Sequence, residues 1–187
     1  MSTYRAPLEE MQFVLNELAG MAEVAKLPGC EEAEPETVAA ILEEASRFAT
    51  DVLDPLNRSG DQRGARLTED GTVHTPQGFR DAYWKFVENG WNGLAKSPEF
   101  GGQGLPQIVA AAVEEMWHAS NMAFELCPLL TQGAIEAIEL NGSDALTITT
   151  NDQGNAGIDP GLSGTASNEQ DTDTATTRSV VARLATT

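Results

Sequence analysis

The sequence predicts an all-α protein, a helical bundle of four to five helices followed by a disordered C-terminal tail. Up to Leu146, apolar residues recur three and four positions apart in several segments, which is typical of amphipathic helices. No segment shows a convincing strand alternation. After Leu146 the helical periodicity stops and does not return. A chain of 187 residues is long enough for one domain with a buried core and a tail.

The charge and composition of the chain argue against two classes of protein, those that bind nucleic acid and those that span a membrane. The net charge of −18 argues against nucleic acid as a partner, because a phosphate backbone is bound by clustered Lys and Arg, and only 11 such residues are spread along the chain. The longest purely apolar run, residues 108–113, is far too short to cross a membrane. No apolar segment follows Arg5 as in a signal peptide, so we expect a cytoplasmic protein with free thiols at Cys30 and Cys127.

Two helices are predicted before the first long polar segment. The first begins at Pro7 in the stretch "APLEEMQFVLNELAGM", where acidic residues suit the positive end of a helix dipole. The second begins at Pro35 and ends before Pro55. The apolar stripe of the first comprises Leu8, Met11, Leu15, Leu18 and Ala22, and that of the second comprises Val38, Ile41, Leu42, Ala45, Phe48, Ala49 and Val52.

Turn residues separate the second helix from the third. The segment "NRSGDQRGARLTEDGTVHTP" is polar, which predicts an exposed loop with a short hairpin centred on Asp70-Gly71. The third helix is expected to start from Thr75-Pro76 and to end at a left-handed cap formed by Asn89-Gly90. Its apolar residues are Phe79, Tyr83, Phe86 and Val87.

A glycine-rich connection precedes the last two predicted helices. The stretch "WNGLAKSPEFGGQGLP" holds four glycines and indicates a shaped loop. The fourth helix is expected from Leu105-Pro106 to about Met122, and the fifth ends at Asn141-Gly142. The fourth is expected to bury Ile108, Val109, Ala112, Val113, Met116 and Ala119, and the fifth carries Leu129, Leu130, Ala134, Ala137 and Ile138.

The final segment, residues 147–187, holds ten threonines and no aromatic residue. Such a composition buries too little apolar surface to offset the entropy lost on ordering, so we expect disorder with at most a short helix around residues 179–184. The predicted organisation is therefore an N-terminal helical extension (1–34), a helical domain (35–146) and a disordered or unrelated tail (147–187).

Three patterns in the sequence are candidates for sites of chemistry. Glu114 and His118 lie four apart on one helix, which is half of a carboxylate metal site, but no second pair accompanies them, and we favour a histidine bonded to a carboxylate. The loop "PEFGGQGLP" lacks the spacing of a phosphate-binding loop, which favours a tight turn. The three tryptophans, Trp84, Trp91 and Trp117, are interpreted as core and helix-junction residues. We therefore predict no catalytic, cofactor-binding or metal-binding residue.

Two stretches carry a resemblance to a known family. The opening "YRAPLEEMQFVLNEL" resembles the N-terminal extension of a bacterial subgroup of FAD-dependent acyl-CoA dehydrogenases, the subgroup that includes the 3-methylmercaptopropionyl-CoA dehydrogenases. The stretches "GWNGLAKSPEFGGQGLPQ" and "EMWHASNMAFELCPLLTQGAIEAIELNGSDAL" resemble the helical N-terminal domain of the same enzymes. Together they cover residues 1–146.

The resemblance implies a composite active site. In the family, a carboxylate base removes the α-proton of an acyl-CoA thioester while hydride leaves the β-carbon for the flavin. The base belongs to a C-terminal bundle and a "TEPxAGSD"-like flavin segment belongs to a β-domain, and this chain contains neither. By position, the resemblance places Leu126, Leu129, Leu130 and Gly133 in the wall of the acyl-chain pocket. The alternative, that these residues only pack the bundle, stays open.

Resemblance and helical periodicity end at the same place. After "NGSDAL" the family continues with a segment like "YLPKLxSGEWTGT", whereas this chain reads "TITTNDQGNAGID". We expect a gene that is truncated or shifted out of frame there, and a product that is inactive alone and binds no FAD. Two alternatives are one part of a split dehydrogenase, whose other domains act in trans, and a non-catalytic acidic module for protein contacts. Apolar faces that miss their partner domains are expected to favour self-association.

Overall fold

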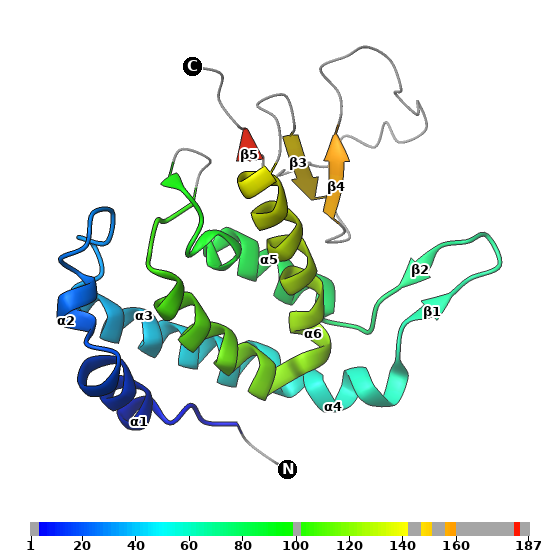
Figure 1. Cartoon of the computed structure of the whole chain (residues 1–187). Helices are drawn as coiled ribbons and strands as arrows, with labels where there is room; N and C mark the ends of the chain where they lie inside the picture. The colour runs from blue at the N-terminus through cyan, green and yellow to red at the C-terminus, as the bar shows by residue number, and fades with distance from the viewer. Residues whose placement is uncertain (1–3, 99–101, 142–146, 151–155, 160–181, 184–187) are drawn as a thin grey trace.

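The structure is a computed structural model that describes residues 4–98, 102–141, 147–150, 156–159 and 182–183. Helices make up most of the described chain, which confirms the all-α prediction (Figure 1). Their bounds are α1 Leu8–Phe13, η1 Val14–Leu18, α2 Met21–Val24, α3 Pro35–Phe48, η2 Ala49–Leu53, α4 Asp54–Arg63, α5 Phe79–Glu88, η3 Trp91–Gly93 and α6 Gln107–Asn141. Here η1 and η2 are π-helical turns and η3 is a 3-10 turn.

The first predicted helix is interrupted by a π-helical turn. The amide of Ala19 donates to the carbonyl of Val14 at 2.9 Å, five residues back instead of four. The extra residue in this turn rotates the following side chains around the helix axis. Met11 and Leu15 are buried as predicted, but Leu18 is 72% exposed, so its placement on the buried stripe was wrong. Gly20 then takes a left-handed conformation, and α2 begins after it.

The second predicted helix begins at Pro35 as expected but does not end before Pro55. The π-helical turn η2 follows α3, and Pro55 stands in the first turn of α4, where its missing N–H coincides with the change of hydrogen-bond pattern. The helix therefore continues to Arg63, through residues that the sequence analysis interpreted as loop. Tyr4 ties the N-terminal segment to this region, because its amide donates to Asp54 and its carbonyl accepts from Thr50.

The hairpin predicted at Asp70-Gly71 is confirmed. Strand β1, Arg66–Leu67, pairs antiparallel with β2, Val73–His74, and the hairpin projects from the helical body beyond the end of α4 (Figure 1). The helix α5 then starts at Phe79, slightly later than Thr75-Pro76. It ends at the C-cap residue Asn89, and Gly90 after it takes the left-handed conformation, as predicted.

The two last predicted helices form one element, α6, with a break at Asn121. The backbone of Asn121 has φ −157° and ψ 83°, values outside the helical region, and the second half of α6 turns away from the first (Figure 1). Its buried side chain accepts from the amide of Phe124 at 3.1 Å, as an N-cap does, and donates to the carbonyl of Leu53 at 3.0 Å. The break therefore has a specific hydrogen-bonded cause.

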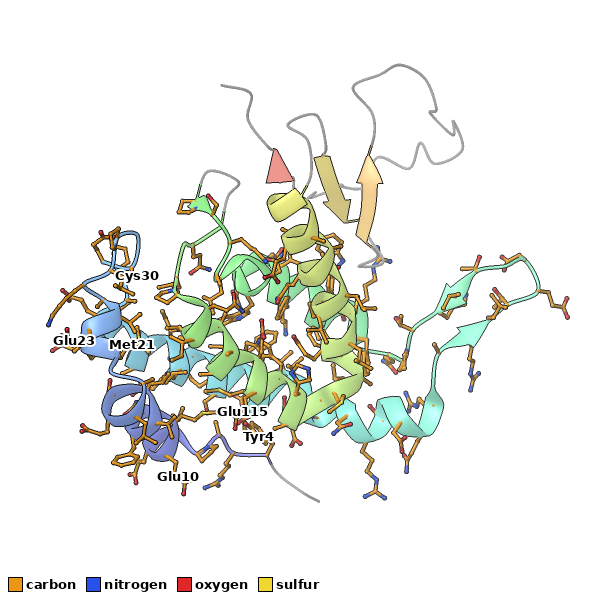
Figure 2. The ribbon with its side chains drawn as sticks, in the orientation of Figure 1. Tyr4, Glu10, Met21, Glu23, Cys30 and Glu115 are labelled. Carbon is orange, nitrogen blue, oxygen red and sulfur yellow. The ribbon has the colours of Figure 1, made fainter. Side chains whose placement is uncertain are left out.

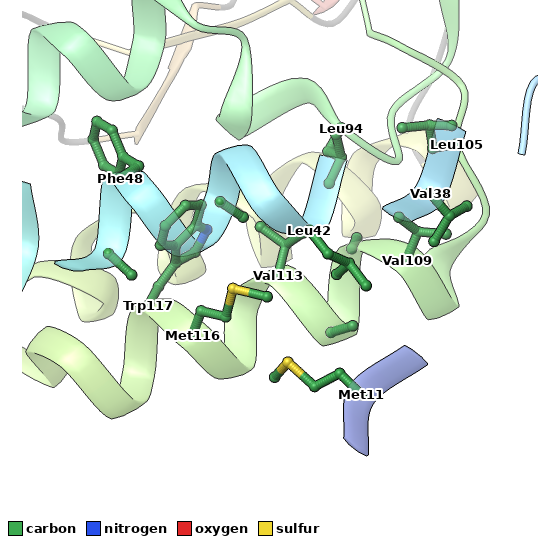
Figure 3. Close-up of a cluster of buried hydrophobic side chains, with 14 of the residues drawn as sticks. Met11, Val38, Leu42, Phe48, Leu94, Leu105, Val109, Val113, Met116 and Trp117 are labelled. Atoms are coloured by element: carbon green, nitrogen blue, oxygen red, sulfur yellow. The ribbon is translucent and has the colours of Figure 1, made fainter. Parts of the chain in front are cut away.

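The core lies between α3, α5 and the first half of α6. The predicted residues Val38, Leu42, Val109, Val113 and Met116 are buried in it (Figure 3). Ala119, also predicted to be buried, is exposed because it lies on the outer face of α6. An aromatic cluster closes one end of the core and is made of Phe48, Phe86, Trp91, Trp117 and Phe124.

Trp117 stands at the centre of this aromatic cluster. Its ring contacts Phe48 and Trp91 edge-on, with centroids 5.3 Å apart in both pairs. These contacts confirm the interpretation of Trp91 and Trp117 as core and helix-junction residues. Trp84 is half-buried on α5 and packs against Tyr83.

Part of the C-terminal segment forms strands that the sequence analysis did not expect. Strand β3, Thr147–Thr150, pairs antiparallel with both β4, Ala156–Asp159, and β5, Ala182–Arg183, and β4 lies against α6. Within the short helix expected at residues 179–184, the two described residues are strand instead. The β-branched residues of β3 favour extended backbone, and β5 is extended because it pairs with β3. The remaining residues of the expected disordered tail lie outside the described ones.

The capping amide of Asn121 gives a first prediction. The substitution Asn121→Ala removes both hydrogen bonds and leaves the buried Leu53 carbonyl and Phe124 amide without their partner, so it should lower the free energy of unfolding by about 2–4 kcal/mol. Urea titration followed by circular dichroism measures this loss. The matched control is Asn57→Ala on the exposed face of α4, which should change the free energy by less than about 0.5 kcal/mol. Equal losses in the two variants would contradict the proposed cap.

Candidate functional site

The four predicted site residues lie on the second half of α6, which Asn121 caps. Leu126, Leu129, Leu130 and Gly133 fall three and four positions apart, so the helix brings them onto one face. This face is exposed, with Leu130 73% accessible. A Cβ built on Gly133 meets no atom within 4 Å, so open space adjoins this position.

Met122 extends this face toward the break, and we call these five residues the α6 stripe. The opposite face of the same half-helix packs inward and comprises Phe124, Glu125, Pro128, Thr131 and Ile135. Among the described residues nothing covers the α6 stripe, so an apolar row of this length calls for a ligand or a partner surface. The structure thus places the predicted residues on one exposed face, and their role as a pocket wall stays a prediction.

Glu125 is a buried charge-bearing group that the sequence analysis missed. Its side chain is fully buried, and neither carboxyl oxygen has a hydrogen-bond partner. Desolvation by burial raises the pKa of Glu125 to about 8, and repulsion from Glu114 adds to the shift. The carboxyl is therefore mostly protonated at neutral pH. A glutamate next to three leucines in an amphipathic helix is ordinarily expected to face solvent. No signal in the sequence therefore indicated that Glu125 is buried.

His118 is half-buried, but its hydrogen-bond partner is not the carboxylate that we expected. The Nδ1 atom of His118 lies 2.8 Å from the backbone carbonyl oxygen of Glu114, not from its carboxylate. Partial burial raises the pKa of Glu114, and the nearby His118 and Lys96 oppose that shift. No group of three or more potential metal ligands occurs among the described residues, so the pair stays half a site.

A small cavity lies between the turn η3 and α6. Its volume of about 20 Å³ is enough for one water molecule, and the indole Nε1 of Trp91 is buried without a hydrogen-bond partner. The cavity is lined by Trp91, Asn92, Leu94, Ala95, Lys96, Gln107, Ala110, Val113, Glu114, Trp117 and Gln132. Its size excludes an acyl-CoA or a flavin.

The glycine-rich connection acts as a tight turn in its described part. The amide of Gly102 donates to Ser97, that of Gln103 to Gly93 at 2.8 Å and that of Gly104 to Lys96 at 2.9 Å. A Cβ on Gly102 would lie 2.0 Å from the Lys96 carbonyl oxygen, so only glycine fits this approach. These amides are already engaged by the backbone and offer no cradle for a phosphate.

Two hollows in the described part of the chain do not fit an FAD. One, about 530 Å³, is an open groove beside α2 and the start of α3, and three glutamates line it against one lysine. Carboxylates there repel a pyrophosphate. The second is the water-sized cavity beside Trp91, which is too small for a flavin.

The chain is similar to proteins of one known family. The sequence profile "Acyl-CoA dehydrogenase, N-terminal domain" matches residues 35–147, more than half of the chain. The chain belongs to the acyl-CoA dehydrogenase family. It is also similar to the 3-methylmercaptopropionyl-CoA dehydrogenase of Ruegeria pomeroyi (strain ATCC 700808 / DSM 15171 / DSS-3), with 43% identity over 143 residues, 76% of this chain and 24% of the relative. The chain thus spans about a quarter of the length of the curated relative it matches.

Membership in the acyl-CoA dehydrogenase family agrees with the observed fold and with the resemblance stated above. The matched region runs from the first residue of α3 to the first residue of β3. It therefore contains the whole α6 stripe and Glu125.

None of the helices in the described part of the chain combines the length and apolar character that a bilayer crossing requires.

The close approach at Gly102 gives a prediction for this acyl-CoA dehydrogenase domain. Gly102→Ala should lower the free energy of unfolding by about 2–3 kcal/mol, because the new methyl group overlaps backbone that has no room to move. Gly133→Ala is the control and should raise it by about 0.5–1 kcal/mol, because the helical position has open space. Thermal and urea unfolding measure both, and a neutral Gly102→Ala would contradict this packing.

The buried carboxyl of Glu125 predicts a pH-dependent stability. Below about pH 4.5 both folded and unfolded states hold the proton. From there to about pH 8 only the unfolded state ionises, so stability should fall by up to about 1.4 kcal/mol per pH unit. Above that range both states are charged and the loss levels off.

The control for this pH dependence is Glu125→Gln, which keeps the shape of the side chain and cannot ionise. The difference in unfolding free energy between the two proteins should widen from pH 5 to pH 8 and then stay constant, with the parent chain increasingly the less stable. Urea titrations at a series of pH values measure it. Parallel curves over the whole range would show that Glu125 is not buried in the folded state.

Proposed function

We propose that this chain provides the N-terminal helical domain of an FAD-dependent acyl-CoA dehydrogenase, and that the α6 stripe forms one wall of its acyl-chain pocket. The observation that carries the proposal is the exposed apolar row on α6, since the neighbouring helices α3, α4 and α5 expose no large apolar side chain. Support comes from the family match, which includes this row, and from the relative, whose name assigns it an acyl-CoA substrate.

The stripe suits an alkyl chain of an acyl-CoA thioester. Leu126, Leu129 and Leu130 offer apolar surface that loses contact with water when a chain lies on it, at about 25 cal/mol per Å². Gly133, which has no side chain, leaves room at the end of the row. A wall of this kind positions the substrate for chemistry carried out by other groups.

The chain alone is proposed to be inactive. FAD supplies the hydride acceptor when it is bound to an intact enzyme of the family, and the described residues offer no fitting site for it. Glu125 is enclosed and Glu114 lines only a water-sized cavity, so neither of these two carboxyl groups can reach an acyl-CoA.

A chimeric enzyme tests this function. Residues 1–146 of this chain replace the matching segment of the 3-methylmercaptopropionyl-CoA dehydrogenase, and flavin absorbance and acyl-CoA oxidation are measured with an artificial electron acceptor. The chimera should be yellow and active, whereas the isolated 187-residue chain should be colourless and inactive. A yellow isolated chain that oxidises an acyl-CoA would contradict the proposal. Activity that appears when the missing segment is added as a separate polypeptide would support a split enzyme.

Within the chimera, Leu126→Trp tests the wall. The larger side chain should shorten the pocket and raise KM for the longer acyl-CoAs by about tenfold, a loss of roughly 1–3 kcal/mol of binding, with less effect on short ones. Leu67→Trp on the distant hairpin is the matched control and should leave KM unchanged. If both variants retain the parent preference for chain length, the α6 stripe is not the acyl wall.

A further inference from the structure

One side chain joins the half-helix that carries the α6 stripe to a neighbouring element. Asn121 is fully buried, and its amide donates to the carbonyl of Leu53 at 3.0 Å and accepts from the amide of Phe124 at 3.1 Å. The first bond crosses to η2, and the second lies within the half-helix. The same side chain therefore begins the half-helix and ties its first turn to η2.

Leu53 is a firm point of attachment for this bond. It is fully buried at the end of η2, and the next residue, Asp54, accepts from the amide of Tyr4 at 3.2 Å. Tyr4 also lies close to Glu115 on the first half of α6 (Figure 2), and burial together with the charge of Glu115 raises the pKa of its hydroxyl. The N-terminal segment thus links the end of η2 to the first half of α6, on the other side of the break.

Apolar packing alone does not fix the direction of the half-helix. On its inward face the ring of Phe124 contacts that of Phe86, with centroids 5.6 Å apart. Burial of apolar surface is non-directional, so such a contact tolerates a small rotation. A hydrogen bond weakens steeply when its angle changes. Because the backbone of Asn121 is outside the helical region, the bond from its side chain to Leu53 is the directional constraint at the junction.

A small change of angle at Asn121 becomes a large displacement along the α6 stripe. Gly133 lies about 18 Å along the helix from Asn121, at a rise of about 1.5 Å per residue. A tilt of about 5° moves a point at that distance by about 1.6 Å, and moves Leu126 by less than half as much. A misplacement of about 1 Å at a positioned substrate costs on the order of a hundredfold in rate. The far part of the stripe is therefore the part most sensitive to the junction.

We propose that Asn121 is a positioning residue for the acyl wall. Its bond to the Leu53 carbonyl sets the angle of the α6 stripe and thereby the preference of the enzyme for acyl-chain length. This inference rests on the proposed function, in which the stripe is that wall. Asn121 is enclosed by the fold, so it acts through the exposed leucines of the stripe and not by contact with the substrate.

Two substitutions separate the two bonds of Asn121. Asn121→Ser keeps an oxygen that caps the half-helix, but its hydroxyl is one bond shorter than the amide and cannot also reach Leu53. Asn121→Ala loses both bonds. A positioning role predicts the same loss of alignment in both variants, although the alanine variant should be the less stable. Leu42→Ala in α3 is the matched control, because it lowers stability by a core cavity and leaves the junction intact.

Distance measurements on the 187-residue chain test the alignment without a substrate. Spin labels are attached to cysteines introduced at Asn57, on the exposed face of α4, and at Leu130, on the stripe. Cys30 and Cys127 are replaced by alanine in every protein compared. Electron paramagnetic resonance should give one narrow distance distribution for the parent and for the core-cavity control. In both Asn121 variants it should shift or broaden by about 1 Å or more. An unchanged distribution in either variant overturns the proposal.

Kinetics of the chimeric enzyme test the consequence for the substrate. Asn121→Ser should raise KM for long acyl-CoAs by about tenfold, the low end of what one methylene contributes in an apolar pocket, and should change kcat for short ones by less than about twofold. Leu42→Ala should leave the chain-length preference unchanged. An equal loss of activity on all chain lengths in Asn121→Ser would assign it to stability alone and contradict a positioning role.

The Leu126→Trp variant separates failure of this inference from failure of the proposed function. If Leu126→Trp changes the chain-length preference and Asn121→Ser does not, the positioning role is overturned while the acyl wall stands. If neither variant changes it, the acyl wall itself is wrong, and the positioning role falls with it. A change in both, together with the altered distance distribution, supports the proposal.

Discussion

The buried amide of Asn121 fixes the direction in which the second half of α6 leaves the core. One side of the amide caps this half-helix at Phe124, and the other side holds the carbonyl of Leu53 at the end of η2. A regular helix through this position would carry Phe124 away from the aromatic cluster. Because the amide satisfies donors and acceptors on both elements, the break is a defined junction. The orientation of the α6 stripe and of Glu125 follows from it.

This junction explains how one half-helix is apolar on both faces. The inward face completes the aromatic core through Phe124, while the outward face carries the leucines of the α6 stripe. A helix that is apolar all round is ordinarily buried all round. In this chain only the inward face packs against other described residues. The arrangement suits a domain that contributes a wall to a larger enzyme, as the family match indicates.

The spacing of apolar residues was sufficient to predict the core residues. It was not sufficient to predict where an α-helix contains a π-helical turn. The stripe of Val38 and Leu42 was predicted correctly because regular α-helical spacing applies there, and the cap at Gly90 because glycine readily takes a left-handed conformation. Leu18 was misplaced because a π-helical turn leaves no mark in the spacing of apolar residues, and the extension of the second helix beyond Pro55 was missed for the same reason. The hairpin was predicted because Asp-Gly turns have a strong local preference.

The site was predictable in part. The resemblance supplied Leu126, Leu129, Leu130 and Gly133, and helical spacing alone implies that they share a face. Glu125 was not predictable, since burial of a carboxyl depends on which way the half-helix leaves Asn121, and this is a property of tertiary packing. The expected bond between His118 and a carboxylate was wrong for a related reason, because a backbone carbonyl competes with a carboxylate for the imidazole.

The π-helical turn η1 also indicates how an exposed apolar surface can arise on a helix. A π turn is equivalent to a single inserted residue in an α-helix, and it changes the phase of every side chain that follows without altering their identity. In this chain one such residue is enough to turn Leu18 from the buried face of the helix to the exposed face. Met21, which follows the left-handed Gly20, is buried. Insertion or loss of one codon in that turn is therefore a short mutational route by which the N-terminal extension gains or loses an apolar outer surface with the core left intact.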